Sequence, residues 1–268
     1  MLEPILGEKV SPQTVSRVLR SLDAAVVSFH HRLLEDEYCY LFVDGICLKA
    51  KEADGVKKKR VLCAYGVTLE GKRQLIDFRQ ATGESQASWE AFLRDLYERG
   101  LRGNKLRLIV TDGSTGLHSA LDTVFPYVLR QRCWVHKLRN VEAKLPKKVH
   151  QECLGGVKTI YQAESKREAV ANFRRWAQEW RGRYPKAVRC VEEDLEELLN
   201  FLACPKLHWR KVRTTNAIER TFREVRRRTR PMSCFENRES VERIIFGIVH
   251  YLNAKWKDKP VPQFTQNT

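Results

Sequence analysis

The sequence lacks the features of secreted and membrane proteins. No apolar run approaches the roughly 18 residues that cross a bilayer, and Met1–Val10 carries acids instead of the apolar segment of a signal peptide. The eight cysteines are scattered and include no Cys-x-x-Cys pair. Neither a disulfide framework nor a zinc site of the usual spacing is therefore expected. These absences predict a reduced, cytoplasmic protein with no membrane partner.

Positive charge dominates what is present. Lys and Arg number 49 against 33 Asp and Glu, which gives the 268-residue chain a net charge of +16. A polyanionic partner explains this excess, because each phosphate that a cation neutralises releases condensed counterions and favours binding. Ribosomal and membrane-surface proteins share this signature, so the charge by itself does not identify the partner.

The amino-terminal segment, residues 1–36, has a helical pattern. Ser11 is a suitable N-cap and Pro12 a suitable first residue for a helix within Leu6–Glu35. The stretch Ser11–Val18 resembles the second helix of a helix-turn-helix. A plain amphipathic helix that packs on the next domain is an equally good interpretation.

The hydrophobic period changes at Tyr38, and residues 37–146 predict an α/β core. Three strands come first, at Tyr38–Ala50, Arg60–Leu69 and Arg73–Gln80. Alternating helices and strands follow, at Ser85–Arg99 (helix), Leu106–Thr111 (strand), Gly116–Val124 (helix), Tyr127–Gln131 (strand) and Trp134–Leu145 (helix). This order predicts a ribonuclease-H-like fold, a mixed five-stranded sheet flanked by helices.

The remaining residues have helical spacing only. Residues 147–207 lack strand signals and predict an all-helical insertion, in which the acidic run Glu192–Glu197 forms a solvated helix face. Residues 208–257 predict the carboxy-terminal helices of the core, at Thr215–Arg230 and Asn237–Trp256. Residues 258–268 are expected to be a disordered tail, and the basic run Lys57–Arg60 a solvated loop.

Two aspartates interrupt or end apolar strands. Asp44 lies within Tyr-Leu-Phe-Val-Asp-Gly, and Asp112 ends Leu-Ile-Val-Thr-Asp-Gly. Each alone is equally well explained as a turn or cap residue before glycine. The first and fourth strands of this fold are neighbours, however, so both carboxylates are expected at one edge of the sheet. Their mutual repulsion there predicts a bound hard divalent cation.

A third carboxylate is expected from a later helix, and Glu219 is the best candidate. Asn216 and Glu219 are three residues apart and share a helix face beside several arginines. Glu224 is the competing candidate in the same helix. Without the two aspartates, a surface glutamate paired with neighbouring arginines would be the simpler interpretation.

Four motifs in this order resemble the Mutator-type DDE transposases, including their bacterial insertion-sequence branch. They are the two aspartate blocks, Gln131–Lys137 (Gln-Arg-Cys-Trp-Val-His-Lys) and Arg213–Arg220 (Arg-Thr-Thr-Asn-Ala-Ile-Glu-Arg), and the resemblance spans Ser11–Trp256. It implies a ribonuclease-H-like fold with Asp44, Asp112 and Glu219 as the catalytic, metal-binding triad. It also implies strand cleavage at transposon ends and strand transfer into target DNA, within a homodimer or larger synaptic assembly at the nucleoid.

The two-metal arrangement that this triad implies needs no covalent intermediate. Two Mg²⁺ (or Mn²⁺) ions about 4 Å apart activate water or a DNA 3′-hydroxyl and stabilise the leaving oxygen. Asp44 is expected to bridge both ions, with Asp112 and Glu219 each favouring one.

The element Cys133–His136 corresponds to the Cys-x-x-His signature of these transposases. No second Cys or His pair stands nearby, so zinc is not expected. A structural or DNA-positioning role close to the acids is one interpretation for Cys133 and His136. A buried cysteine beside an ordinary hydrogen-bonded histidine is the other. Trp134 is expected either to pack in the core or to stack on a base.

The densest basic segment of the chain surrounds Glu219. So many like charges would repel one another on an isolated helix, which favours phosphate contacts at the transposon end over a merely solvated face. The residues expected to bind DNA are Arg213, Asn216, Arg220, Arg223, Arg226, Arg227, Arg228 and Arg230.

The sequence departs from the resemblance at its amino terminus. The related transposases carry a longer region there that reads transposon ends, and only the last helices of such a region are expected in this chain. A truncated or catalytically silent, transposase-derived DNA-binding protein is therefore the alternative, against which the presence of all three acids argues. A ribonuclease-H-like nuclease without strand transfer, and a basic RNA-binding protein, are the other candidates.

Overall fold

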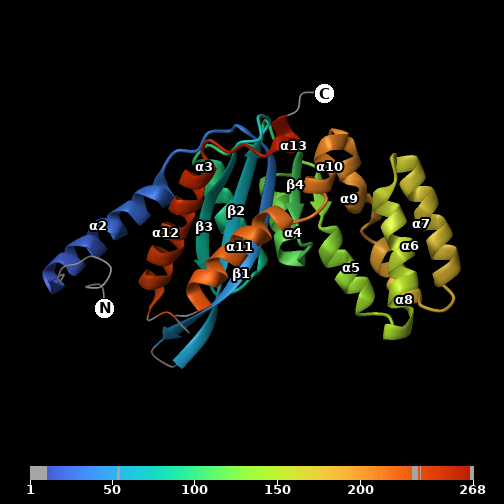
Figure 1. Ribbon diagram of the computed structural model, residues 1–268, viewed down its shortest axis with the longest axis horizontal. Coiled ribbons are helices and arrows are strands. Elements are labelled where there is room, and N and C mark those ends of the chain that lie inside the picture. Colours follow the sequence, from blue (N-terminus) through green and yellow to red (C-terminus); the bar gives the residue numbers. More distant parts are fainter. Residues whose placement is uncertain (1–10, 53–54, 231–234, 236, 266–268) are drawn as a thin grey trace.

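A computed structural model describes residues 11–52, 55–230, 235 and 237–265. Its strands form one five-stranded sheet in the order β3-β2-β1-β4-β5. They are β1 (Tyr38–Glu52), β2 (Gly55–Thr68), β3 (Arg73–Ala81), β4 (Leu108–Thr111) and β5 (Arg130–Arg132). β1, β2 and β3 form an antiparallel meander, whereas β4 runs parallel to β1 and β5 parallel to β4. The predicted element order and mixed α/β sheet are confirmed (Figure 1).

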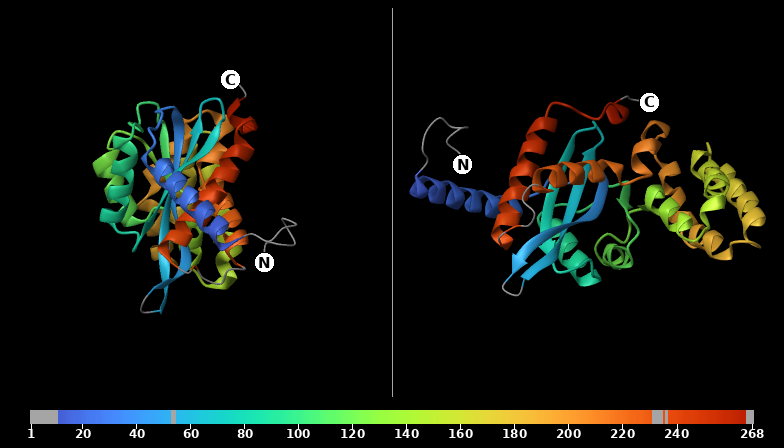
Figure 2. Two further views of the ribbon diagram at one scale, coloured as in Figure 1. Left: turned by 90° about the vertical axis from the view of Figure 1, so that its left-hand side faces the viewer. Right: turned by 60° about the horizontal axis from the view of Figure 1, so that its bottom comes forward.

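Helices cover both faces of the sheet and extend beyond its β5 edge (Figures 1 and 2). Those that precede the helical segment are α2 (Pro12–His31), α3 (Gln86–Glu98), α4 (Thr115–Val124) and α5 (Trp134–Glu142). The helical segment contains α6 (His150–Gln162), α7 (Lys166–Trp180), α8 (Pro185–Glu192), α9 (Leu195–Leu199) and α10 (Trp209–Val212), with 3₁₀ turns at Lys147–Val149, Asn200–Ala203 and Lys206–His208. The last helices are α11 (Asn216–Thr229), α12 (Arg238–Trp256) and α13 (Pro262–Thr265). None of the described helices combines the length and apolarity needed to span a membrane.

Alternation along the strands divides the core into two layers. Side chains of successive strand residues point to opposite faces. Tyr40 and Phe42 accordingly join a cluster with α11, α12 and the helical segment, whereas Leu41 and Val43 pack under α3 and α4. The first cluster continues without interruption to Trp180 of α7, so the helical segment and the sheet share one apolar core.

The acidic run Glu192–Glu197 is only in part the solvated helix face that its composition predicts. Glu192, Glu193 and Glu196 are exposed, but α8 ends at Glu192 and α9 begins at Leu195. Asp194 pairs with the buried ammonium of Lys137, and Glu197 accepts a hydrogen bond of 2.8 Å from Arg132 Nε. The prediction failed for these two acids because the cations that need them are far away in the sequence.

The basic run Lys57–Arg60 is also not a loop. It belongs to β2, where Lys57 pairs with Ala50 and Arg60 with Cys47 of β1. The β1–β2 hairpin therefore extends past the rest of the sheet as a basic ribbon (Figure 2). Pairing satisfies the backbone groups of both strands, which outweighs the loop-like composition of the side chains.

The described residues after Asp258 are ordered as far as Thr265, contrary to the disorder predicted for them, and residues 266–268 of the predicted tail lie outside the described residues. The amide of Val261 donates to the carbonyl of Gly71 at 2.8 Å. The ring of Phe264 is buried against Tyr40 and His208. Two apolar side chains are enough to dock the short helix α13, because the burial of each stabilises the docked state by about 2 kcal/mol.

α2 begins as the sequence predicts and packs through its second half. Ser11 accepts a hydrogen bond of 3.1 Å from the amide of Thr14, and Val18 remains exposed. Further along, Val26 is buried, and His30 bridges two carboxylates, with Nδ1 2.7 Å from Asp77 and Nε2 3.2 Å from Glu242. This docking agrees with the amphipathic-helix interpretation.

The His30 bridge predicts a pH-dependent stability. Burial opposes the charge of His30, but the hydrogen bonds to Asp77 and Glu242 outweigh it and raise the pKa from 6.5 to about 9. The stabilisation is therefore complete below about pH 6.5 and is lost as the pH rises through about 9. We expect His30→Ala to lower the free energy of unfolding by about 2 kcal/mol at pH 6 and by much less at pH 10, measured by urea unfolding. The exposed neighbour His31→Ala is the control, and an equal, pH-independent loss in both variants would contradict the bridge.

Candidate active site

Strand register places the two aspartates side by side. Val43 of β1 pairs with Thr111 of β4 in parallel, so Asp44 and Asp112 follow directly on neighbouring strands. Side chains two residues apart in a strand point to the same face of the sheet. Asp44 therefore faces the same side as Phe42, and Asp112 the same side as Val110. Phe42 and Val110 belong to one apolar cluster. The two carboxylates therefore share the sheet face that α11 covers.

α11 brings a third carboxylate to this edge. Its apolar side packs on the same face through Ile218, Phe222 and Val225. Glu219 lies in its first turn and is close enough, together with Asp112, to raise the pKa of Asp44. The structure thus brings together the three acids predicted from the sequence. Glu224 does not take part, because it pairs with Arg227 and Arg228 on the other side of the helix.

The surroundings of Asp44 disfavour its ionised form. Burial, first, and then the charge of Asp112 raise its pKa to about 7, while a hydrogen bond from the amide of Gly45 and the charge of His136 oppose the rise. Among the described residues no lysine or arginine forms an ion pair with Asp44 or Asp112. Clustered carboxylate oxygens whose repulsion His136 offsets only in part are the ligand set that a hard divalent cation prefers, so these residues fit Mg²⁺ or Mn²⁺.

Asp112 also has the local role that its sequence context suggests. Its Oδ1 accepts a hydrogen bond of 2.9 Å from the amide of Ser114, in a turn that Gly113 permits with φ of 89°. Oδ2 forms no hydrogen bond within the described residues. The turn interpretation of Asp112 is therefore correct, and it is compatible with the place of Asp112 beside Asp44 on neighbouring strands.

Cys133 and His136 lie beside Glu219. His136 Nε2 is 3.9 Å from Glu219 Oε1, and its hydrogen bond to Cys133 is the main cause that raises the pKa of His136 to about 9. Burial opposes ionisation of Cys133, but hydrogen bonds from His136 and Thr215 outweigh it and lower the pKa of the thiol. Ligand atoms of Cys133, His136 and Glu219 all lie within 4.8 Å of one another. These three side chains are close enough to hold one metal ion, although the spacing of Cys133 and His136 in the sequence gave no sign of Glu219 as a third candidate ligand. The expected absence of zinc therefore stays a prediction.

Trp134 packs in the core. Its side chain is 1% exposed, and its indole N–H donates to the carbonyl of Leu198 at 2.8 Å. Of the two interpretations of this residue, stacking on a base is wrong for the structure described.

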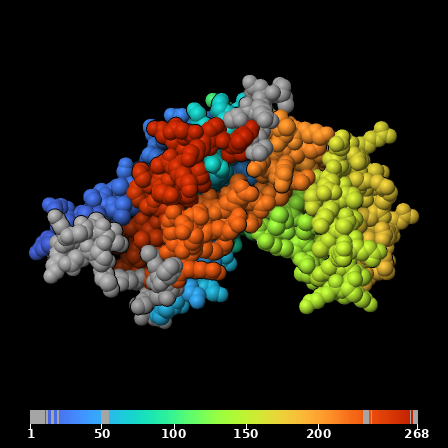
Figure 3. Space-filling model, viewed as in Figure 1, coloured from blue at the N-terminus to red at the C-terminus, as the bar shows by residue number. Residues whose placement is uncertain are grey.

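A basic groove of about 920 Å³ borders α11 on the face shown in Figure 3. Four of the residues predicted to bind DNA line it at helical spacing with exposed side chains, namely Asn216, Arg220, Arg223 and Arg227. Further cations on its walls are Arg73, Arg210, Lys211 and Lys255. Arg226 and Arg230 are exposed as well, so α11 presents a cationic surface that begins next to Glu219.

Three of the predicted DNA-binding arginines already have protein partners. Arg213 donates to the carbonyl of Tyr161 at 2.7 Å and lies over its ring. Arg227 and Arg228 are both paired with Glu224, although the side chain of Arg227 remains exposed. A DNA contact for any of the three stays a prediction.

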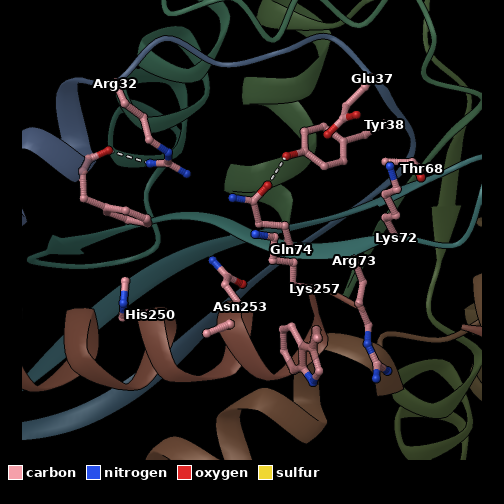
Figure 4. A pocket seen from close by; sticks show the side chains of 13 residues that line it. Arg32, Glu37, Tyr38, Thr68, Lys72, Arg73, Gln74, His250, Asn253 and Lys257 are labelled. Carbon is pink, nitrogen blue, oxygen red and sulfur yellow. Dashed lines mark hydrogen bonds between the residues drawn. The ribbon is translucent and has the colours of Figure 1, made fainter. Parts of the chain in front are cut away.

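A separate cavity of about 430 Å³ lies between β3 and α12 (Figure 4). Tyr38 donates to Gln74 Oε1 at 2.7 Å in its wall, and His250 and Asn253 line it from α12. None of the three clustered acids contributes to it. The cavity is therefore not the candidate site.

Sequence reasoning missed two residues that contact the site. Thr215 belongs to one of the four motifs but had no expected role, yet it donates to Glu219 Oε1 at 2.8 Å. Arg132 donates to the carbonyl of Gly113 at 3.2 Å and to Asp194. Their positions next to Cys133 and within the Glu219 motif were the available signals.

These features define an α/β protein with clustered carboxylates at a sheet edge beside a strongly basic helix. The chain belongs to the Mutator family of transposases, whose family model matches residues 1–259. This confirms the family predicted from the four motifs.

Curated relatives are transposases of bacterial insertion sequences. The chain is 34% identical to the transposase for insertion sequence element ISRM5 of Rhizobium meliloti, over 96% of this chain and 64% of that protein. It is 32% identical to that for IS905 of Lactococcus lactis, over 95% and 64%, and 34% identical to that for IS6120 of Mycolicibacterium smegmatis, over 97% and 80%. The chain thus spans 64% of the length of the first two relatives.

The strain at Asp44 predicts that removing its charge stabilises the metal-free protein. The pKa of this carboxyl is raised from 3.8 to about 7, so the folded state loses stability as the pH rises from 4 to 7. We expect Asp44→Asn to raise the free energy of unfolding by about 2 kcal/mol at pH 8 in EDTA, measured by thermal unfolding. The exposed Asp258→Asn should change little. An Asp44→Asn protein less stable than the parent would show that the carboxylate is satisfied within the fold.

Proposed function

We propose that this chain is the catalytic part of a DDE transposase, which cleaves DNA at transposon ends and transfers the cut strand into target DNA. The observation that carries the proposal is the meeting of Asp44, Asp112 and Glu219 at one sheet edge. Membership of the Mutator family and the cationic surface of α11 support the same function.

We also propose a ribonuclease-H-like core with a helical insertion. The strand order β3-β2-β1-β4-β5 is in keeping with such a core. The segment from residue 147 to α10 contains only helices and 3₁₀ turns, and it separates the strand of Asp112 from the helix of Glu219. In this division residues 37–146 and 208–257 form the core.

The three acids would hold two Mg²⁺ or Mn²⁺ ions, which supply Lewis acidity for the attacking and leaving oxygens of phosphoryl transfer. Asp44 is the most buried of the acids, and a bound cation would favour its ionised form against burial and the charges of Asp112 and Glu219. Thr215 fixes the Glu219 carboxylate through its hydroxyl. His136 places positive charge next to Asp44 and Glu219 and reduces their repulsion.

The exposed cations of α11 would bind the DNA backbone. Arg220, Arg223 and Arg227 form a line that starts one residue after Glu219. Phosphate contacts along this line would fix where the duplex enters the acidic site without reading its sequence. Cleavage of two ends and their joining to one target needs more than one such site, which favours a homodimer or larger synaptic assembly acting on DNA of the nucleoid.

Cleavage assays with matched glutamate variants test the assignment. The substrate is DNA that spans the regions on both sides of the gene for this chain, with Mg²⁺ or Mn²⁺. We expect Glu219→Gln and Asp112→Asn to lower the cleavage rate more than about 100-fold, because loss of a metal ligand exceeds the effect of an outer residue. Glu224→Gln, in the same helix, should retain the parent rate.

Two outcomes would contradict this assignment. Equal cleavage by the parent and Asp112→Asn would show that Asp112 is not a catalytic residue. A loss of cleavage in Glu224→Gln, without a loss in Glu219→Gln, would show that Glu224 and not Glu219 is the third acid. Transfer of a pre-cut end separates a transposase from a nuclease that only cuts. A parent chain that binds DNA and neither cuts nor joins it would support the catalytically silent alternative.

The salt dependence of DNA binding tests the cationic surface. Arg220, Arg223 and Arg227 replaced together by Gln should reduce the slope of log K against log salt by about 1 for each phosphate that the variant no longer neutralises. Arg167, Arg174 and Arg175 of α7, replaced together by Gln, remove the same charge from the far end of the molecule (Figure 1). Equal changes in both triple variants would show that net charge, and not the face of α11, binds DNA.

A further inference from the structure

The thiol of Cys133 contacts the residue at which α11 begins. Its Sγ accepts a hydrogen bond of 3.2 Å from the amide of Thr215, whose Oγ1 lies 3.3 Å away. Cys133 is 1% exposed and Thr215 is fully buried. Thr215 occupies the N-cap position of α11, yet its side chain makes no cap hydrogen bond to the helix backbone. The thiol therefore satisfies a buried amide that the helix cannot satisfy.

The same cysteine also contacts the strand of Asp112. The amide of Cys133 donates to the carbonyl of Thr111 at 2.8 Å, and the amide of Trp134 donates to the carbonyl of Arg213 at 3.1 Å. Two consecutive residues thus connect the end of β4 with the segment that leads into α11. Cys133 links the strand that carries one acid to the helix that carries another.

Thr215 completes the connection to Glu219. A hydroxyl has one proton to donate, and the nearer acceptor of Oγ1 is Glu219 Oε1 at 2.8 Å. The amide of Thr215 consequently donates to Sγ of Cys133, while the hydroxyl of Thr215 donates to the carboxylate of Glu219 and orients it. Together these bonds define a connected path from Thr111 through Cys133 and Thr215 to Glu219.

We propose that Cys133 and Thr215 form a clamp that sets the position of Glu219 relative to Asp44 and Asp112. Both are positioning residues in this proposal, since they are buried and act on Glu219 through hydrogen bonds. The proposal rests on the proposed function and gives a physical role to the Cys-x-x-His element. The clamp matters because a displacement of a ligand by about 1 Å weakens a metal site and slows the reaction strongly.

The test compares pairs of variants at each clamp position. Cys133→Ser and Thr215→Ser keep a group that can make the hydrogen bond, whereas Cys133→Ala and Thr215→Val remove it. Cys153→Ala is the matched control, because Cys153 is equally buried but lies in α6. Mn²⁺ binding to the DNA-free protein is measured by electron paramagnetic resonance, and cleavage is measured at limiting and at saturating Mn²⁺.

We expect Cys133→Ala and Thr215→Val to weaken Mn²⁺ binding about 10- to 100-fold, the range for residues that orient metal ligands. Saturating Mn²⁺ should restore part of their cleavage activity. The serine variants and Cys153→Ala should bind Mn²⁺ like the parent. Thermal unfolding of each variant shows whether it is folded, and Thr215→Val tests the clamp without touching the cysteine.

Three results would overturn the clamp. Folded Cys133→Ala and Thr215→Val that bind Mn²⁺ like the parent would show that Glu219 is positioned without it. An equal loss in Cys133→Ser and Cys133→Ala, or a thiolate-to-metal absorption band with Co²⁺ that Cys133→Ser abolishes, would make Cys133 itself a metal ligand. Failure of the proposed function would give a different result. In that case Asp112→Asn would bind Mn²⁺ and cleave DNA like the parent, independently of the results for the clamp variants.

Discussion

Repulsion between carboxylates at a buried sheet edge is the constraint around which this molecule is organised. Asp44 is 9% exposed, and its pKa of about 7 reflects burial first and the charges of Asp112 and Glu219 next. A fold does not gather such groups spontaneously, because each brings a desolvation penalty and repels the others. The stability that holds them there must come from elsewhere in the chain.

That stability comes from two apolar layers and a few buried polar contacts. β1 supplies residues to both layers, so the strand that carries Asp44 is anchored on each face. α5 and its N-cap residue contact two distant segments. Cys133 reaches the start of α11, whereas Trp134 and Lys137 reach Leu198 of α9 and its N-cap residue Asp194. A rigid frame of this kind allows acids from distant segments to stay close although their charges repel one another.

Much of the frame could be read from the sequence. The dense apolar run of β1 and the helical period of α3 depend on local burial, and both elements were predicted to within about two residues. The proximity of Asp44 and Asp112 could be predicted from the order of strands and helices, because the first and fourth strands of a fold with this order are neighbours. The prediction failed for the acidic run at Asp194 and for Phe264, because their partners, Lys137 and Tyr40, lie more than fifty residues away.

The sequence by itself determined the α/β class and the family and nominated the acids, because periodicity and motif order are properties of neighbouring residues and of their succession. Only the tertiary structure decided that Glu219 and not Glu224 joins the aspartates, and that Cys133 holds Thr215. Those choices depend on which side of α11 packs against the sheet and on hydrogen bonds between segments far apart in the chain. The local sequence pattern does not predict the packed side of α11 or these long-range hydrogen bonds, because the distance between such segments is set only by the packing of the core.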